Sequence, residues 1–134
     1  MKKLLKVLFV CVLLTVLSGG GLYYYQHNKA KAATIDKLAD QTIQTNQIST
    51  NLNSDNLIQV KFSIELDSKD TKKQAEKIVP IIESDIIKIL SQSNKGDLKN
   101  IAAFEEKIKN QLNVRFSDGE GKIVHVYTTE LLIQ

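Results

Sequence analysis

An uncharged, mostly apolar run lies near the start of the chain. It extends over nineteen residues, from Val7 to Tyr25, and follows a six-residue tail, 1–6, that contains three lysines. A helix of that length spans about 30 Å, the thickness of the hydrocarbon layer of a membrane, and lysines before it favour a cytoplasmic N-terminus. We therefore predict a basic cytoplasmic tail at 1–6 and a single transmembrane helix at 7–25, with the rest of the chain exported.

A cleaved signal peptide is the alternative for this run. The notable small-x-small site, Ala30-Lys31-Ala32, lies several polar residues beyond the apolar run. A signal peptide normally has a shorter apolar region that adjoins its cleavage site. The pattern therefore favours an anchor that stays on the protein.

Residues 26–47 are rich in Gln, Asn, Thr, Ala and Lys. Their apolar residues Ile35, Leu38 and Ile43 are too sparse to cover a core. This composition is typical of a solvent-exposed spacer. We interpret 26–47 as a linker or stalk and place the folded domain at 48–134.

Strict alternation of apolar and polar residues between Leu57 and Leu66 predicts the clearest strand of the domain. The apolar positions are Ile58, Val60, Phe62, Ile64 and Leu66. A period of two is typical of a sheet with one buried and one wet face. A shorter strand is predicted at Ile48–Leu52, and the turn cluster 53–56 separates the two.

Helical spacing replaces this alternation after Ser68. Apolar residues recur at intervals of three, four or seven, at Ala75, Ile78, Val79, Ile82, Ile86, Ile89 and Leu90. Pro80 lies inside the pattern, where it removes a backbone hydrogen bond and crowds the preceding turn. We therefore expect either a kink at Pro80 or a helix that starts afresh near Val79.

Two isoleucines, Ile81 and Ile87, fall outside the main apolar stripe of this helix. They make the helix apolar over a wider arc than a surface helix needs, which suits burial on two sides or contact with another chain. Together with the adjacent Lys88, they are our candidate contacts for an oligomer or a partner.

A second helical region is expected after the stretch Asn94-Lys95-Gly96. Gly96 is a natural left-handed C-cap for the first region, and Asp97 can cap the second. Helical spacing then continues, and a break near Asn100 is compatible with it. The apolar positions of this region are Leu98, Ile101, Phe104, Ile108 and Leu112.

The end of the chain is interpreted as a short strand at 114–116, a glycine-bearing turn at 117–121 and a long strand at 122–133. Apolar residues occupy both parities of the long strand. A central position in the sheet would explain this, and so would a bulge near Thr128-Thr129 that switches the buried face. Strands that enclose two helical regions predict a small α+β domain with an antiparallel-type sheet.

The charge distribution argues against nucleic-acid binding. The whole chain has a formal charge of +3, but its first 31 residues contain five lysines and no acidic residue. The remainder therefore has 13 basic against 15 acidic residues, a net charge of −2, and lacks the basic field that attracts nucleic acid. The lone Cys11 lies within the apolar run, so one chain can form neither a disulfide nor a cysteine metal site.

Catalytic groups are scarce. His27 lies in the linker and His125 in the last predicted strand, where a histidine is usually structural. Glu105-Glu106 could be acids or bases, but adjacent helical positions point in different directions, and mixed charges there usually mark a solvated face. The glycines fit neither a dinucleotide-binding motif nor a phosphate loop. We predict no catalytic residue, no metal site, no cofactor and no small-molecule substrate.

Several blocks of the sequence, in one order, resemble the FliL family of flagellar basal-body-associated proteins. The blocks are Asn51-Leu52, Lys61–Leu66, Pro80–Asp85, Leu90-Ser91, Asp97-Leu98 and the terminal Val126–Gln134. The resemblance covers essentially the whole chain. Thr128 and Leu131 stand where the family usually has Phe, and Ala103 stands where it often has Gly, so contacts made through those family side chains do not carry over.

This resemblance implies a non-enzymatic accessory of the flagellar motor. Such a protein is a single-pass protein of the cytoplasmic membrane at the basal body, with an exported domain like that of stomatin and prohibitin that assembles into rings. Its partners would be stator units of the MotA/MotB type, and its role would be to support torque, swimming, swarming and chemotactic rotation. The alternatives are a membrane-tethered stomatin-like scaffold unrelated to flagella and, less favoured, a tethered envelope enzyme.

Overall fold

The computed structural model describes residues 34–116 and 121–134. Residues 34–41 are helical, and 38–134 form one compact unit. In chain order its elements are β1 (Thr42–Gln44), β2 (Ile48–Asn51), β3 (Leu57–Leu66), α2 (Lys69–Lys77), α3 (Val79–Ser91), the short 3-10 helix η1 (Asp97–Lys99), α4 (Ile101–Phe116) and β4 (Ile123–Ile133). This order confirms the α+β class.

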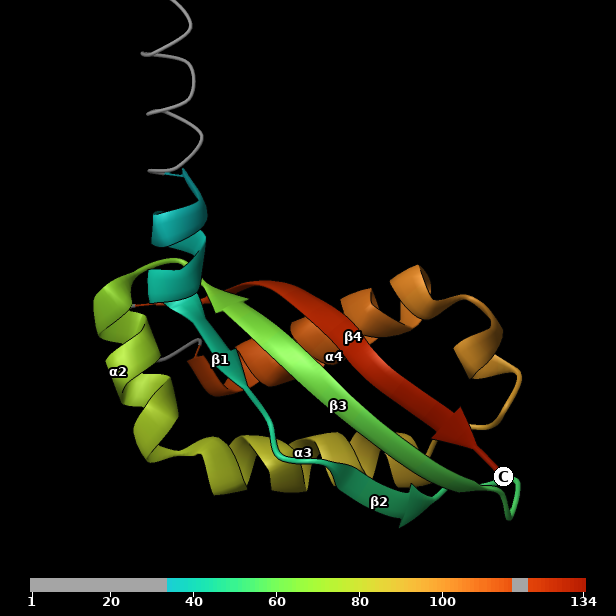
Figure 1. The fold of residues 1–134 in the computed structure, drawn as a ribbon. Coiled ribbons are helices and arrows are strands. Elements are labelled where there is room, and N and C mark those ends of the chain that lie inside the picture. Colours follow the sequence, from blue (N-terminus) through green and yellow to red (C-terminus); the bar gives the residue numbers. More distant parts are fainter. Residues whose placement is uncertain (1–33, 117–120) are drawn as a thin grey trace, which may run out of the picture. The chain divides into compact units, whose positions relative to one another are not determined.

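The sheet is antiparallel and is organised around β3 (Figure 1). β4 pairs with β3 along nearly its whole length, from Ile58 to Leu66. β1 and β2 therefore share the other edge of β3, β1 beside residues 63–65 and β2 beside 57–60. The long predicted strand at Leu57–Leu66 has the bounds that the sequence pattern gave it.

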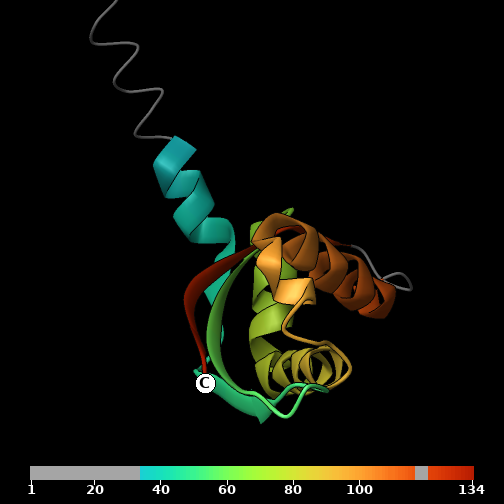
Figure 2. The same cartoon turned by 90° about the vertical axis from the view of Figure 1, so that its right-hand side faces the viewer.

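The core lies between one face of this sheet and the helices, which pack on that face only (Figure 2). The five alternating residues of β3 are at most 1% exposed, as their period of two predicts. The helices complete the core with Ala75, Ile82, Ile86, Ile89, Leu90, Leu98, Phe104, Ile108 and Leu112.

The two helices α2 and α3 are separate, which confirms a restart near Val79. Ser68 caps α2 by accepting a hydrogen bond from the Thr71 amide at 3.1 Å. Ile78 leaves the helical conformation, and Pro80 lies in the first turn of α3. Proline is tolerated there because the first-turn amides have no partner within the helix.

The predicted role of Gly96 as a left-handed cap is wrong. α3 ends at Ser91, and Gly96 has an ordinary right-handed backbone with φ −67°. Asn94 and Asp97 instead close this loop on each other, each side chain accepting a hydrogen bond from the other's amide at 2.8 and 3.1 Å. The break at Asn100 is confirmed, because its side chain accepts from the Ala103 amide at the start of α4.

The short strand expected at 114–116 is also wrong. These residues form the last turn of α4, which runs to Phe116. Leu112 is buried and Phe116, one turn later, packs partly buried against the core, whereas Val114 between them is 71% exposed. The helical stripe therefore continues to the end of α4. Three residues with β propensity do not outweigh an established helix, since each added residue gains a hydrogen bond. The glycine-bearing turn falls largely on residues 117–120, outside the described residues.

A bulge explains the two-sided apolar pattern of β4. Lys61 pairs with Glu130 and Phe62 with Thr128, so Thr129 is the extra residue. A second irregularity leaves Val124 unmatched. Each insertion switches the parity that faces the core. The apolar residues placed opposite the buried residues of β3 are Ile123, Val126, Leu131 and Ile133, which pair with Leu66, Ile64, Val60 and Ile58. Ile123 and Val126 are buried, Ile133 is partly buried, and Leu131 is 39% exposed.

The central position proposed as an alternative for this strand is not found. Within the described residues, β4 pairs with β3 alone. It is therefore an edge strand, and the bulge accounts for its pattern.

Residues 42–47, expected in the linker, belong to the folded domain, and 42–44 form a strand of its sheet. Thr42–Gln44 pair with β3, and Ile43 is 5% exposed within the core. An isolated apolar residue in a polar stretch gives no periodic signal, so the sequence pattern placed the domain start at Ile48. The predicted transmembrane helix at 7–25 lies outside the described residues, and no helix within them is long and apolar enough to cross a membrane.

Candidate functional site

The three candidate contact residues lie on the outer part of α3. Ile81 and Ile87 are 45% and 40% exposed, whereas Ile82 between them is 1% exposed. At about 100° per residue, Ile81 and Ile87 point about 120° apart and flank the buried stripe on opposite sides. Lys88 follows Ile81 by seven residues and therefore shares its side. The structure thus places Ile81 and Lys88 on the same side of α3, two turns apart, and leaves Ile87 on the other flank.

Lys88 takes part in an ionic link between α3 and α4. Its ammonium lies 3.3 Å from Oδ1 of Asp85, and its side chain is 69% exposed. Arg115 of α4 also pairs with Asp85, its Nε donating to Oδ2 at 2.6 Å. The Asp85 carboxylate therefore holds the end of α4 against α3. Lys88 retains an exposed positive charge beside Ile81.

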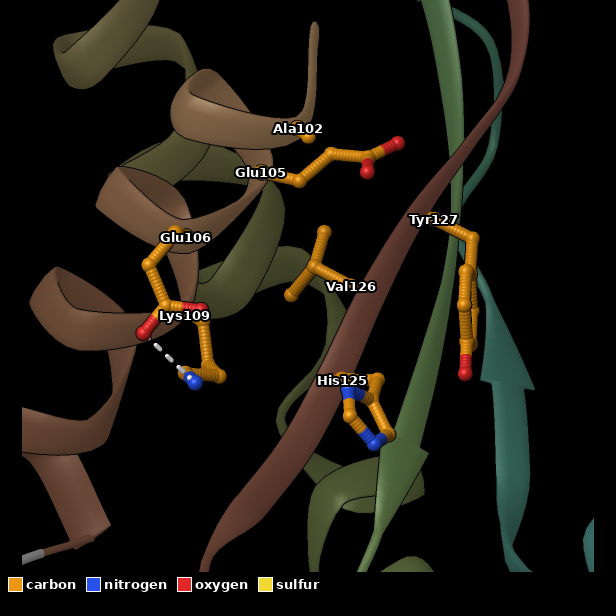
Figure 3. Close-up of a pocket in the computed structure, with 7 residues that line it drawn as sticks. All are labelled: Ala102, Glu105, Glu106, Lys109, His125, Val126 and Tyr127. Carbon is orange, nitrogen blue, oxygen red and sulfur yellow. Dashed lines mark ion pairs between the residues drawn. The ribbon is translucent and has the colours of Figure 1, made fainter.

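A hollow of about 170 Å³ lies between α4 and β4 (Figure 3). It contains the carboxylates that the sequence singled out and the strand histidine. Its lining residues are Ala102, Glu105, Glu106, Lys109, His125, Val126 and Tyr127. It is therefore a candidate ligand site to test for acid–base chemistry.

Both carboxylates of this hollow are occupied by neighbours. Glu105 Oε1 accepts a hydrogen bond from the backbone amide of Thr128 at 2.6 Å. Glu106 pairs with Lys109 at 2.7 Å, and the hydrogen bond from Lys109 holds the pKa of Glu106 below its usual value. A general acid at neutral pH needs the opposite shift. The two carboxylates of the hollow therefore serve structural contacts, that of Glu105 between α4 and β4 and that of Glu106 within α4.

Tyr127 extends this polar cluster onto the outer face of the sheet. Its hydroxyl donates to Glu65 Oε2 at 3.1 Å, and its ring lies 5.8 Å from the ring of His125. Desolvation, followed by the bond to Glu65 and its charge, raises the pKa of Tyr127. A phenol with a raised pKa is a poor base at neutral pH. Among the described residues, no group of His, Cys, Asp and Glu side chains could hold a metal ion.

The sequence analysis missed the contact between Glu105 and Thr128. The two residues are 23 positions apart, and no sequence pattern pairs them. The contact depends on the bulge, which leaves the Thr128 amide pointing away from β3 and towards α4. The predicted bulge near Thr128-Thr129 was the available signal, but it does not specify the acceptor.

Known proteins are similar to this chain over the whole described domain. Residues 41–134 match the family described as flagellar basal body-associated protein FliL. The flagellar protein FliL of Bacillus subtilis (strain 168) is 29% identical over 124 residues, covering 87% of this chain and 86% of that protein. The family match begins at Gln41, immediately before β1, and ends with the last residue after β4. This chain therefore belongs to the FliL family of flagellar basal-body-associated proteins.

Proposed function

We propose that this protein is a non-enzymatic accessory of the flagellar motor that associates with the stator units at the basal body. The observation that carries the proposal is the family match over residues 41–134, which covers every strand and helix of the domain from β1 to β4. The family supports a role at the basal body, and the stator is the finer assignment made here.

The topology proposed with this role is a single-pass membrane protein. Residues 1–6 form a cytoplasmic tail, 7–25 cross the cytoplasmic membrane and the α+β domain lies outside it. The uncharged run and the lysines before it support this orientation. The segment between the membrane and the domain is shorter than first expected, because β1 already belongs to the sheet.

The proposed contacts are made by α3, and the copies are proposed to form a ring. Ile81 and Ile87 expose apolar surface on both flanks of the helix, and Lys88 adds a cation beside Ile81. Two flanks are useful in a ring, because each copy then meets two neighbours through different surfaces. The proposed partners are copies of this chain and MotA/MotB-type stator proteins, without nucleic acid or a small-molecule substrate.

Localisation tests this proposal. A fluorescent protein fused to the N-terminus of the full chain is expected to form foci at flagellar bases, and removal of the stator proteins is expected to disperse them. A basal-body component fused to a second fluorophore serves as the control, since its foci remain without stators. Foci that form away from flagella, or that persist unchanged without stators, would contradict the stator assignment.

A further inference from the structure

The helix that ends at residue 41 continues into β1 without an intervening loop (Figure 1). The last carbonyls of a helix have no partner within it and need other donors. Here the Thr42 hydroxyl donates to the Leu38 carbonyl at 2.6 Å. Lys72 of α2 donates to the Ala39 carbonyl at 3.2 Å. The end of the helix is therefore closed partly by its own strand and partly by α2.

An ion pair makes a second contact between this helical turn and α2. Asp40 pairs with Lys69 in the first turn of α2, with side chains 51% and 63% exposed. The hydrogen bond and charge of Lys69 hold the pKa of Asp40 below its usual value. A single exposed pair contributes little to stability, because solvent screens its charges. The pair matters because it acts together with Lys72: both lysines of α2 contact the last helical turn before β1, and two contacts fix its direction better than one.

Gln41 makes the most buried contact of the set. It is 9% exposed, although it lies in a polar stretch that has no periodic pattern. Its side-chain amide donates to the Asp67 carbonyl at 2.7 Å, 26 residues away. A buried amide without such a partner would be costly, so this bond fixes the position of Gln41.

The acceptor of this bond is itself firmly held. The Asp67 carboxylate accepts from the Thr71 hydroxyl at 2.6 Å and from the Lys122 amide at 3.1 Å. The Asp67 amide donates to the Lys122 carbonyl at 3.1 Å. Asp67 thereby connects the end of β3, the start of α2 and the start of β4. Gln41 is bonded to the point where these three elements meet.

We propose that residues 38–42 form a stiff joint, closed by Lys69, Lys72 and Asp67, that fixes the direction in which the chain enters the domain. A flexible spacer would let the domain swivel, whereas this joint makes the last helical turn and the domain move as one body. The mechanical use of the joint rests on the proposed motor function. In a membrane-anchored accessory, a load on the domain would be passed to residues 38–42 without loss in a hinge at that point.

Distance measurements between two spin labels test the joint in the full-length protein. The parent carries Cys11→Ser, with labels at Leu38→Cys on the last helical turn and Ala103→Cys on α4, both exposed positions. The parent is expected to give one narrow distance distribution. Lys69→Ala with Lys72→Ala, and separately Gln41→Leu, are expected to broaden it towards the roughly 10 Å spread of a flexible four-residue segment.

Lys73→Ala is the matched control, because Lys73 lies on the same helix but pairs with Asp70 of α2 at 3.3 Å. It is expected to leave the distribution narrow. A broad distribution in the parent, or an unchanged width in the double lysine variant, would overturn the proposal. The lysine variants change an exposed residue, Lys69, and a partly buried one, Lys72, neither of which belongs to the core. They therefore remain informative even where Gln41→Leu fails to fold.

A motility measurement separates this inference from the proposed function. Cells with the double lysine variant are expected to keep basal foci but to lose speed in viscous medium relative to Lys73→Ala. Full speed with broadened distances would overturn the mechanical role of the joint while leaving the motor assignment intact. A gene deletion without any motility defect would overturn the motor assignment, whatever the distances show.

Discussion

Two isoleucines of α3, Ile82 and Ile87, have opposite surroundings, and this contrast assigns them different roles. Ile82 is 1% exposed and packs in the core, whereas Ile87 is 40% exposed. The helical spacing had already separated the core stripe from Ile81 and Ile87. Whether the exposed residues meet a partner depends on surfaces outside this chain, which its own periodicity cannot specify.

Aspartate substitutions distinguish these two roles. Ile82→Asp places an unpaired carboxylate in the core and is expected to lower the free energy of unfolding by more than about 3 kcal/mol. Ile87→Asp is expected to change it by less than about 1 kcal/mol while reducing the size of the assembled oligomer. Urea unfolding and light scattering measure the two effects. Equal stability and equal oligomer size for both variants would contradict this assignment of faces.

The glycines provide a second test at single residues. Gly121 has φ +132°, and a Cβ there would collide with the side chain of Thr71, which binds Asp67. Gly121→Ala is therefore expected to destabilise the domain by about 1–3 kcal/mol. Gly96→Ala, at φ −67°, meets only the movable Asn94 side chain and is expected to cost less than about 1 kcal/mol. Thermal unfolding that ranks the two variants in the reverse order would contradict these backbone assignments.

At the scale of the elements, the edge of β3 opposite β4 pairs with two short strands, β1 and β2, and Thr45 bridges the gap between them. Thr45 lies between β1 and β2, is 3% exposed and accepts a hydrogen bond from the Phe62 amide through its hydroxyl at 3.0 Å. Its own amide donates to the Phe62 carbonyl at 3.0 Å. Thr45 therefore provides hydrogen-bond partners for both backbone groups of Phe62, in the gap between β1 and β2.

Thr45→Val removes this hydroxyl while keeping the shape of the side chain. The Phe62 amide is then buried without its acceptor, and the free energy of unfolding is expected to fall by about 1–3 kcal/mol. Thr50→Val on β2 is the control at a half-exposed position and is expected to change stability by less than about 0.5 kcal/mol. The two variants are compared by urea unfolding. The hydrogen bond would be unimportant if both gave the same midpoint.

Sequence pattern predicted those elements whose burial is periodic. β3 repeats every two residues, and the stripe of α3 repeats every three or four, so both were found with their buried faces. Thr42–Gln44 escaped because a three-residue edge strand has too few positions to show a period. The contact between Glu105 and Thr128 escaped because it arises only once the bulge and α4 are packed together.

At the scale of the whole molecule, the described ion pairs lie on the surface of the α+β domain, outside its apolar core. Glu106 is one example: the hydrogen bond from Lys109 lowers its pKa below the usual 4.5. A lowered pKa in the folded state contributes stability that is fully present above the unfolded value. That contribution is lost as the pH falls through the folded value.

Stability is therefore expected to fall as the pH is lowered from 7 to 3. Glu106→Gln is expected to make this fall shallower, because the variant has no carboxylate to protonate at that position. Glu76→Gln serves as the comparison, since Glu76 approaches Lys72 at 3.9 Å, a looser pair than Glu106 with Lys109 at 2.7 Å. Urea unfolding at a series of pH values measures the slopes. Equal slopes for wild type and Glu106→Gln would mean that Glu106 does not contribute to the loss of stability in acid.

The central claim is that this domain supports the flagellar motor, and swimming under load tests it most directly. Cells with a clean deletion are compared with wild type and with the deletion carrying the intact gene on a plasmid, in ordinary and viscous medium. We expect a loss of speed and of soft-agar spreading that grows with viscosity and is restored by the plasmid. Unchanged motility at every viscosity would contradict the claim.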